Sequence, residues 1–339
     1  MPHSQRVPLS LRLVQHAKRR ARSAAEDWLL STIPSPASAL AASVEQRTAG
    51  WEAVASRRRN DQLTQLARVR LQDVPQLVPL SRSGGCNDDP RLVPQGSDAW
   101  FAQRAGSLTG SSFSEALNFH GDEKMRLVWR QLADGQHRRV AGFIDERNEG
   151  AGCEWGRLHE RSALATYLTA WLLPRCDGAR VLETGFWPIE TRADCAVDLG
   201  ASPDALLEGA ESICSGGVIV EVKCPYRSGS PRAQRHVYAR QLPQIQGMLL
   251  ATGRQSCHLV SWSPTGCSVF DVQGDPAYQG HLVDYLCSFA TAAITETWPL
   301  SSELREQAEA LRAHSAQLAR RAGRIGHIEA SNCLQYSGS

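Results

Sequence analysis

The spacing of hydrophobic residues divides the chain into helical and β-rich stretches. Leucine, valine and alanine recur at helical spacing over residues 10–32 and 37–70, and helical patterns dominate again after residue 90, to about residue 172. Between residues 181 and 272 the pattern changes to short apolar runs, interrupted by one helix at about 235–252. The expected strands cover residues 181–188, 205–207, 218–223, 258–263 and 268–272. This mixture predicts an α/β (α+β) fold.

A loop signal at residues 81–90, rich in Gly, Asn, Asp and Pro, marks the main boundary. We therefore expect a basic, mostly helical N-terminal extension over residues 1–90, a main domain over 91–300, and a C-terminal helix and tail over 301–339.

The tail is expected to be helical over residues 302–328. Leucine or isoleucine recurs there every seven residues, at Leu304, Leu311, Leu318 and Ile325, with Ala308, Ser315 and Ala322 four residues further on each time. This repeat is typical of a short self-associating coil. The polar Ser315 favours the alternative, a helix that packs on its own domain.

Charge separates the N-terminal part from the rest of the chain. The formal net charge is +2, yet residues 1–70 hold 12 Lys/Arg against 5 Asp/Glu, so the remainder is acidic. A basic arm on an acidic body suits a polyanionic partner, and a solvated Arg-rich helix is the alternative. The first 25 residues carry six basic residues and no acid, which fits either an organelle transit peptide or the start of a basic helix.

Composition narrows the class of protein. No apolar run approaches 18 residues, which excludes a membrane-spanning helix. The ten cysteines form no C-x-x-C pair and no zinc-ligand spacing. We therefore expect reduced thiols in an intracellular protein, nuclear or organellar in a eukaryote and cytoplasmic in a bacterium or phage. Of the 37 basic residues only Lys18, Lys124 and Lys223 are lysine, so each lysine is an unusual choice for this chain.

One apolar strand carries charges where a buried strand should have none. In residues 218–223, Val218, Val220 and Val222 share one face, while Ile219, Glu221 and Lys223 share the other. A carboxylate and an ammonium on a core strand are costly to desolvate unless they are paired or bind a metal. An edge-strand ion pair is the alternative. Lysine in place of the usual arginine indicates a need for a compact ammonium group.

A second acid precedes the neighbouring strand. Asp204 follows Ser202-Pro203 and begins a short apolar run, so it meets Glu221 if the two strands pair. Two carboxylates with a main-chain carbonyl form a hard-oxygen site for Mg²⁺, or for Mn²⁺. A metal beside Lys223 suits phosphodiester hydrolysis.

Motifs on both sides of this strand pair resemble those of one nuclease family. The pattern Ser-Pro-Asp204 followed by Glu221-Val-Lys223 resembles the PD-(D/E)XK signature, and Glu221 to Pro225 has the form Glu-x-Lys-Cys-Pro. Three flanking motifs occur in family order: Trp100-x-x-x-Arg104-x-Gly106-x-x-Thr109-Gly-Ser111, Gly156-Arg-Leu-His-Glu160 and Tyr238-x-x-Gln241-x-x-Gln244. Over roughly residues 97–290 the chain thus resembles the lambda-type exonucleases, also called YqaJ-like viral recombinases.

The resemblance implies a restriction-endonuclease-like core, with a central mixed sheet flanked by helices, and a role for each motif. Asp204, Glu221 and the Val222 carbonyl would ligate Mg²⁺, and Lys223 would serve the attacking water. Glu160 would add a metal-side carboxylate or a water contact. Its place on the same helical stripe as Leu164 and Tyr167 supports an inward orientation, with a satisfied buried acid as the alternative. Arg104, Ser111 and Gln244 match residues that hold a DNA 5′-phosphate.

Other residues of the motifs are less settled. Asp194 lies where the family often has a further acid, and Asp198 competes for that role. Gln241 is a further candidate, whereas Trp100 is expected in the core. Ala205 replaces a usual glycine, which would strain a turn with positive φ. Pro243 is harmless in the first turn of a helix and would kink a helix that began earlier.

The expected function is a metal-dependent exonuclease for linear duplex DNA, acting 5′ to 3′ from a 5′-phosphorylated end in recombination or repair. Duplex DNA ends are the expected partner, a single-strand annealing recombinase and further copies of this chain are candidates, and a membrane is not expected. Two alternatives stay open. One is a catalytically idle nuclease fold that binds DNA, and the other is an endonuclease or RNA nuclease that uses the same metal site.

Overall fold

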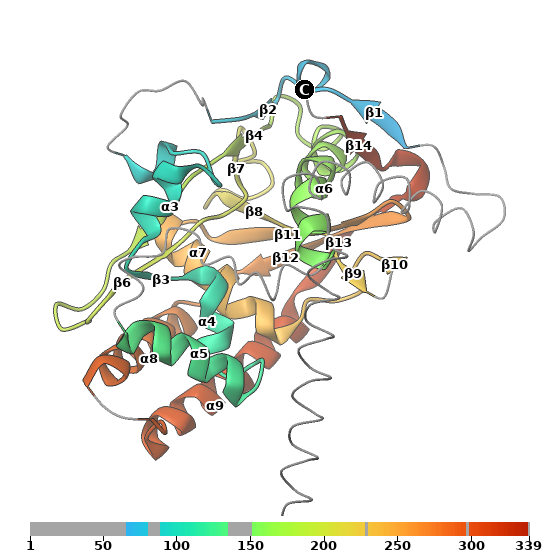
Figure 1. The fold of residues 1–339 in the computed structure, drawn as a ribbon. Coiled ribbons are helices and arrows are strands. Elements are labelled where there is room, and N and C mark those ends of the chain that lie inside the picture. Colours follow the sequence, from blue (N-terminus) through green and yellow to red (C-terminus); the bar gives the residue numbers. More distant parts are fainter. Residues whose placement is uncertain (1–65, 81–88, 135–150, 228–229, 296–297, 338–339) are drawn as a thin grey trace, which may run out of the picture. The chain divides into compact units, whose positions relative to one another are not determined.

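A mixed seven-stranded sheet forms the centre of the fold (Figure 1). All neighbours in it are antiparallel except the pairs β11–β8 and β4–β2, which are parallel. The strand order is β13 (Gly323–Glu329), β12 (Gly266–Gln273), β11 (Ser256–Ser263), β8 (Val218–Lys223), β7 (Ala205–Glu208), β4 (Arg180–Glu183) and β2 (Leu77–Val78). This sheet confirms the predicted α/β class with a mixed sheet.

The structure is a computed structural model that describes residues 66–80, 89–134, 151–227, 230–295 and 298–337. All of them belong to one unit, residues 64–339. The helix predicted at residues 10–32 and most of the one at 37–70 lie outside the described residues, as do most of the basic arm and the transit-peptide question. The described end of the second helix is wrong, because residues 67–69 form the strand β1. No helix among the described residues is long and apolar enough to cross a membrane.

Smaller strand groups surround the central sheet. A three-stranded sheet has the order β3 (Ser107–Thr109), β6 (Asp198–Ala201), β5 (Trp187–Ile189). The C-terminal strand β14 (Leu334–Tyr336) pairs in parallel with β1 (Ala67–Val69), and β9 (Tyr226–Arg227) pairs with β10 (Ser230–Pro231).

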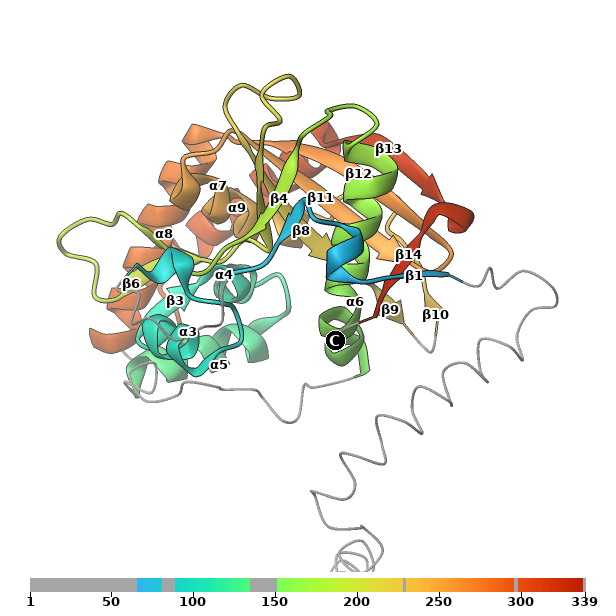
Figure 2. The same cartoon turned by 90° about the horizontal axis from the view of Figure 1, so that it is seen from above.

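Helices cover both faces of the central sheet and enclose two hydrophobic cores (Figure 2). On one face, α6 (Ala151–Tyr167) continues into a π-helical turn (Leu168–Leu172) and packs on β8, β11 and β12. The other core is built from α4 (Gly110–Ala116), α5 (Asp122–Ala133), α7 (Leu242–Thr252), α8 (Pro276–Thr295) and α9 (Ser302–Arg321).

Strand β8 separates the two cores as its sequence predicts. Val218, Val220 and Val222 belong to the core beneath α6, and Ile219 belongs to the opposite core beneath α7. Because β8 lies between β11 and β7, it is not an edge strand, so the edge-strand alternative is wrong.

The sheet extends beyond the bounds predicted for the main domain. Strand β2 lies within the predicted extension and β13 within the predicted tail, yet both pair with the central sheet. The predicted C-terminal helix ends at Arg321, and Ile325 is an exposed residue of β13. The repeat residues that remain in α9, namely Leu304, Ala308, Leu311, Ser315 and Leu318, are buried in the chain's own core. This packing confirms the favoured reading of the tail and leaves no apolar stripe there for a self-associating coil.

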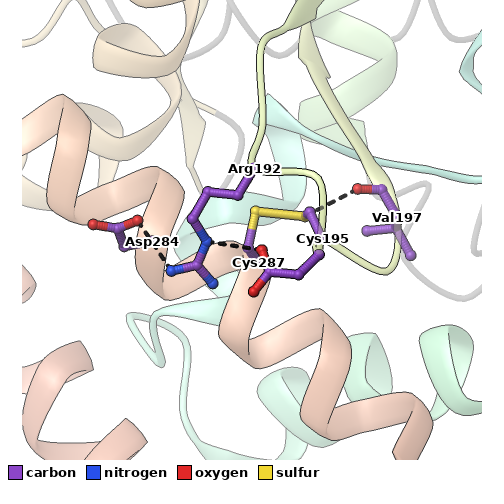
Figure 3. The surroundings of a disulfide bond; sticks show 6 residues. Arg192, Cys195, Val197, Asp284 and Cys287 are labelled. Carbon is purple, nitrogen blue, oxygen red and sulfur yellow. Dashed lines mark hydrogen bonds and ion pairs between the residues drawn. A yellow bond between two sulfur atoms is a disulfide. The ribbon is translucent and has the colours of Figure 1, made fainter.

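A disulfide corrects the prediction that all cysteines are reduced. Cys195, in the loop between β5 and β6, is bonded to Cys287 on α8 (Figure 3). Beside it, Arg192 forms ion pairs with Asp194 and Asp284, so the loop is tied to α8 by charge as well. Seven other cysteines of the described residues are free thiols.

Candidate active site

The pairing of β7 with β8 brings Asp204 next to the charged end of β8. Ala205 lies opposite Val220 in this antiparallel pair, and Asp204 directly precedes Ala205. Asp204 Oδ2 accepts a hydrogen bond of 2.6 Å from the backbone N–H of Val222. The predicted meeting of the two acidic positions is therefore confirmed.

Glu221 is buried, with 1% of its surface exposed, and only one of its oxygens has partners. Oε1 accepts from Lys223 Nζ at 2.5 Å and from Gln244 Nε2 at 2.9 Å. Oε2 is buried with no hydrogen-bond partner. A carboxylate oxygen left unpaired in the interior costs free energy, so this atom is available for a ligand.

Burial and neighbouring carboxyl groups raise the pKa values of Asp204 and Glu160. Burial and the charges of Glu221 and Glu160 raise the pKa of Asp204 well above its usual value. Burial, Glu221 and Glu183 raise the pKa of Glu160 to about 7. Burial lowers the pKa of Lys223, but the charges of Glu221 and Asp204 outweigh burial and raise it overall. The ammonium therefore stays charged at neutral pH beside a site with excess negative charge.

Helix α3 (Asp98–Arg104) supplies a positive group. The Arg104 guanidinium lies 3.8 Å from the centre of the Trp100 ring, and its Nη2 donates to Thr109 Oγ1 at 3.1 Å. Thr109 in turn shares a hydrogen bond of 3.1 Å with Ser111. Within the described part of the chain Arg104 forms no ion pair, and its buried Nε has no hydrogen-bond partner. Burial lowers the Arg104 pKa to about 10, which leaves it charged.

One cleft of about 660 Å³ contains both the acidic and the basic groups. The residues predicted for the site that line it are Arg104, Ser111, Glu160, Asp204, Glu221, Val222, Lys223, Gln241 and Gln244. Negatively and positively charged groups thus face the same space.

Some residues predicted for the site lie outside the cleft, or make contacts with the protein that the prediction did not include. Asp194 is exposed and paired with Arg192, and Asp198 is exposed at the start of β6, so neither lines the cleft. Gln241 caps a turn by accepting from the Tyr238 N–H at 2.9 Å. Gln244 bonds Glu221 and Lys223, and its contact with a phosphate stays a prediction.

The two departures from the family pattern are harmless here. Ala205 is a residue of β7 and does not have a positive φ, so the missing glycine causes no strain. Pro243 occupies the first turn of α7, where the absence of its N–H breaks no helical hydrogen bond.

The cleft also contains residues that the sequence did not single out. Gln95 Nε2 donates to the carbonyl oxygens of Pro203 at 2.7 Å and Thr184 at 2.9 Å. Arg240 lies 4.4 Å from the centre of the Tyr238 ring, and His120 shares a hydrogen bond with Ser114. Arg240 could have been predicted from the sequence, because it lies between Tyr238 and Gln241 in the motif. Gln95 could not, because its partner Pro203 lies more than a hundred residues later in the chain.

The donor set suits a hard cation. Among the described residues, no group of three or more His, Cys, Asp or Glu side chains is arranged as it stands to hold a metal ion. Even so, the unpartnered Glu221 Oε2 and the raised pKa values of Asp204 and Glu160 show uncompensated acidity at one place. Carboxylate oxygens with a backbone carbonyl are ligands that Mg²⁺ and Mn²⁺ accept.

One family model and one solved structure are similar to this chain. Residues 99–255 match the family model of the YqaJ-like viral recombinase domain. Among solved structures, the crystal structure of LHK-Exo in complex with dAMP is similar, with 21% sequence identity, a TM-score of 0.39, and coverage of 66% of this chain and 100% of that chain. The comparison with curated proteins finds no match. The region that matches the model of the YqaJ-like viral recombinase domain, residues 99–255, includes Arg104, Glu160, Asp204, Glu221 and Lys223.

Proposed function

We propose that this chain is a metal-dependent deoxyribonuclease that degrades linear duplex DNA 5′ to 3′ from a 5′-phosphorylated end. The observation that carries the proposal is the joint exposure of Asp204, Glu221, Lys223 and Arg104 to one cleft. The family of residues 99–255 supports action in DNA recombination.

The acidic end of the cleft would hold Mg²⁺, with Mn²⁺ as the alternative ion. Asp204, Glu221 and the Val222 carbonyl are the proposed protein ligands, and Glu160 adds a carboxylate or a water contact. When bound, the metal polarises the phosphate and lowers the pKa of a coordinated water. Lys223 donates to Glu221 and remains protonated, so it can orient the attacking water and stabilise charge on the phosphate oxygens.

The basic end would hold the terminal phosphate. Arg104 has an unsatisfied, buried N–H and no acidic partner in the part of the chain that the structure describes. The exposed hydroxyl of Ser111, linked to Arg104 through Thr109, adds a donor. A guanidinium fork with a hydroxyl suits the oxygens of a phosphate monoester.

A cleavage assay on matched substrates tests the proposal. We expect Mg²⁺-dependent loss of a labelled linear duplex with a 5′-phosphate, slower loss with a 5′-hydroxyl, no cutting of a closed circle, and no activity in EDTA. Lys223→Ala should abolish cleavage. Lys223→Arg should also fail, because a guanidinium does not replace a compact ammonium at this position.

Each other outcome selects an alternative or rejects the site. Full activity of Lys223→Ala would remove this cleft from the mechanism. Cutting of the closed circle or of RNA would favour an endonuclease or RNA nuclease. Calorimetric Mg²⁺ binding without any cleavage would favour a DNA-binding module with an idle nuclease fold.

A further inference from the structure

The indole of Trp100 contacts both ends of the cleft. Its face lies 3.8 Å from Arg104 Cζ, at the basic end. Its Nε1 donates a hydrogen bond of 3.3 Å to Ser202 Oγ, two residues before the acidic Asp204. Trp100 is buried, with 8% of its surface exposed, and packs with Val93 and Phe186 in a small core of its own. The ring is thus fixed by packing while two functional groups contact it.

Ser202 belongs to the turn that presents Asp204. Strand β6 ends at Ala201 and β7 begins at Ala205, so Ser202, Pro203 and Asp204 lie outside both strand ladders. Side chains support this turn instead. Trp100 holds Ser202, and Gln95 holds the Pro203 carbonyl while also bonding that of Thr184. The position of Asp204 therefore depends on these side-chain hydrogen bonds as well as on its own bond from the Val222 N–H.

Arg104 depends on the same ring. Its guanidinium has one hydrogen bond to Thr109 and lies over the indole, an arrangement that stabilises a partly desolvated cation. An anion bound to Arg104 would hold the guanidinium in place over the indole. The same rigid ring carries the N–H that bonds Ser202, so fixing the guanidinium also restrains that hydrogen bond.

We propose that Trp100 is a positioning residue that couples phosphate binding at Arg104 to the placement of Asp204 at the metal site. This inference rests on the proposed function. It means that a 5′-phosphate does more than anchor the DNA end, because the phosphate also strengthens metal binding through Trp100 and Ser202. By linkage, the metal strengthens binding of the phosphorylated end by the same factor.

The test measures this factor by binding rather than by turnover. The affinity of the full chain for short duplexes with a 5′-phosphate or a 5′-hydroxyl is measured by fluorescence anisotropy, in EDTA and in Ca²⁺ as a non-hydrolysing probe ion. In the wild type, Ca²⁺ should raise the preference for the phosphorylated end by roughly fivefold, the scale of one hydrogen bond. Isothermal calorimetry of Ca²⁺ binding to each complex should give the same factor.

Two variants each remove one partner of the hydrogen bond between Trp100 and Ser202. Trp100→Phe keeps an aromatic face for Arg104 but loses the N–H, and Ser202→Ala loses the acceptor. Each should abolish the Ca²⁺-dependent gain in end preference, and the double variant should be no worse than either single one. Trp129→Phe is the control, because Trp129 is buried against Phe289 and Trp298 in the other core and does not line the cleft. It should lower thermal stability without changing the coupling.

The outcomes separate the inference from the function. If the wild type gains preference in Ca²⁺ and both variants keep that gain, the coupling through Trp100 is wrong while the proposed function stands. Additive losses in the double variant also overturn it. A wild type that treats both ends alike overturns the proposed end recognition and the coupling together.

Discussion

Two buried polar residues on adjacent strands of the sheet differ in their surroundings and in their hydrogen bonds. Glu221 on β8 is 1% exposed and His258 on β11 is 2% exposed. His258 lies opposite Val220 and Glu221 lies opposite Leu259, so the two side chains point to opposite faces of the sheet. Glu221 lines the cleft, and His258 is buried beneath α6 beside Tyr167 and Trp171.

His258 is neutralised and satisfied. Burial lowers its pKa to about 4, its Nδ1 lies 2.6 Å from the Tyr167 hydroxyl, and the rings of Tyr167 and Trp171 surround it. Glu221 keeps an unpartnered oxygen and lies among other acids. Burial alone therefore does not mark a functional group. A buried polar atom in a cleft that lacks a hydrogen-bond partner does mark one, because such an atom costs folding free energy and contributes nothing to the stability of the fold.

The largest expected effect comes from removing the Glu221 charge. Glu221→Gln should lower kcat/KM on linear duplex DNA by on the order of a thousandfold, the scale of one preorganised electrostatic group. Metal-free thermal stability should change little, because the repulsion relieved with Asp204 and Glu160 offsets the ion pair weakened with Lys223. The control is Glu208→Gln, at an exposed carboxylate of β7, which should leave both quantities unchanged. Retained activity in Glu221→Gln would show that Glu221, like His258, is a structural residue and not a functional one.

Removing the His258 ring should affect stability instead of chemistry. His258→Ala should lower the unfolding free energy by about 3 kcal/mol, from the cavity and the unpaired Tyr167 hydroxyl. Activity per folded molecule should be preserved. Denaturant unfolding measures the loss, and His281→Ala, at an exposed histidine of α8, is the matched control. A selective loss of activity would place His258 in the site.

The neutrality of His258 also predicts a dependence on pH. Its pKa is about 4 in the fold and about 6.5 when unfolded, so below pH 6.5 the unfolded chain binds a proton that the fold does not. Stability is therefore lost as the pH falls from 6.5. Between pH 7 and pH 5, wild-type protein should lose about 2 kcal/mol more than His258→Gln. Parallel pH curves for the two proteins would contradict a neutral His258.

The smallest expected effect concerns Arg104. Like Glu221, this basic residue lines the cleft and has a buried atom, Nε, without a hydrogen-bond partner. Arg104→Ala should lower kcat/KM roughly tenfold on 5′-phosphorylated duplexes, the scale of one charge-assisted hydrogen bond. Duplexes with a 5′-hydroxyl should be cut at the wild-type rate. Equal losses on both substrates would assign Arg104 a general role in DNA binding.

The sequence predicted the centre of the fold because local patterns determine it. Alternation in residues 218–223 placed Ile219 and Glu221 on one face, and the structure confirms that placement. The burial of the α9 leucines followed from a similar local signal, whereas the first-turn position of Pro243 was one of two alternatives, because the expected helix began at about residue 235 and α7 begins at Leu242. The convergence of Asp204 with Glu221 was predictable because their strands are consecutive in the pairing order.

Long-range contacts were beyond local patterns. Strand β2 has only two residues and pairs with β4 about a hundred positions later, so no periodicity marks it. Asp194 resembled a site acid by spacing, but the disulfide at Cys195 and Arg192 hold its loop to α8, away from the cleft. The identity of the metal, the polarity of digestion and the partners stay predictions, because they depend on molecules other than this chain.

The disulfide turns part of the site into a covalent ring. Cys195 and Cys287 are 92 positions apart, and Asp204, Glu221, Lys223 and Gln244 all lie between them, whereas Arg104 and Glu160 lie outside. A single proteolytic cut within the ring would leave the fragments joined until a reductant is added. In the chain-entropy view, a ring of this size restricts the unfolded chain by about 4 to 5 kcal/mol. The segment that carries Asp204, Glu221 and Lys223 would thus remain one connected piece even with a broken backbone, while Arg104 and Glu160 rely on folding alone.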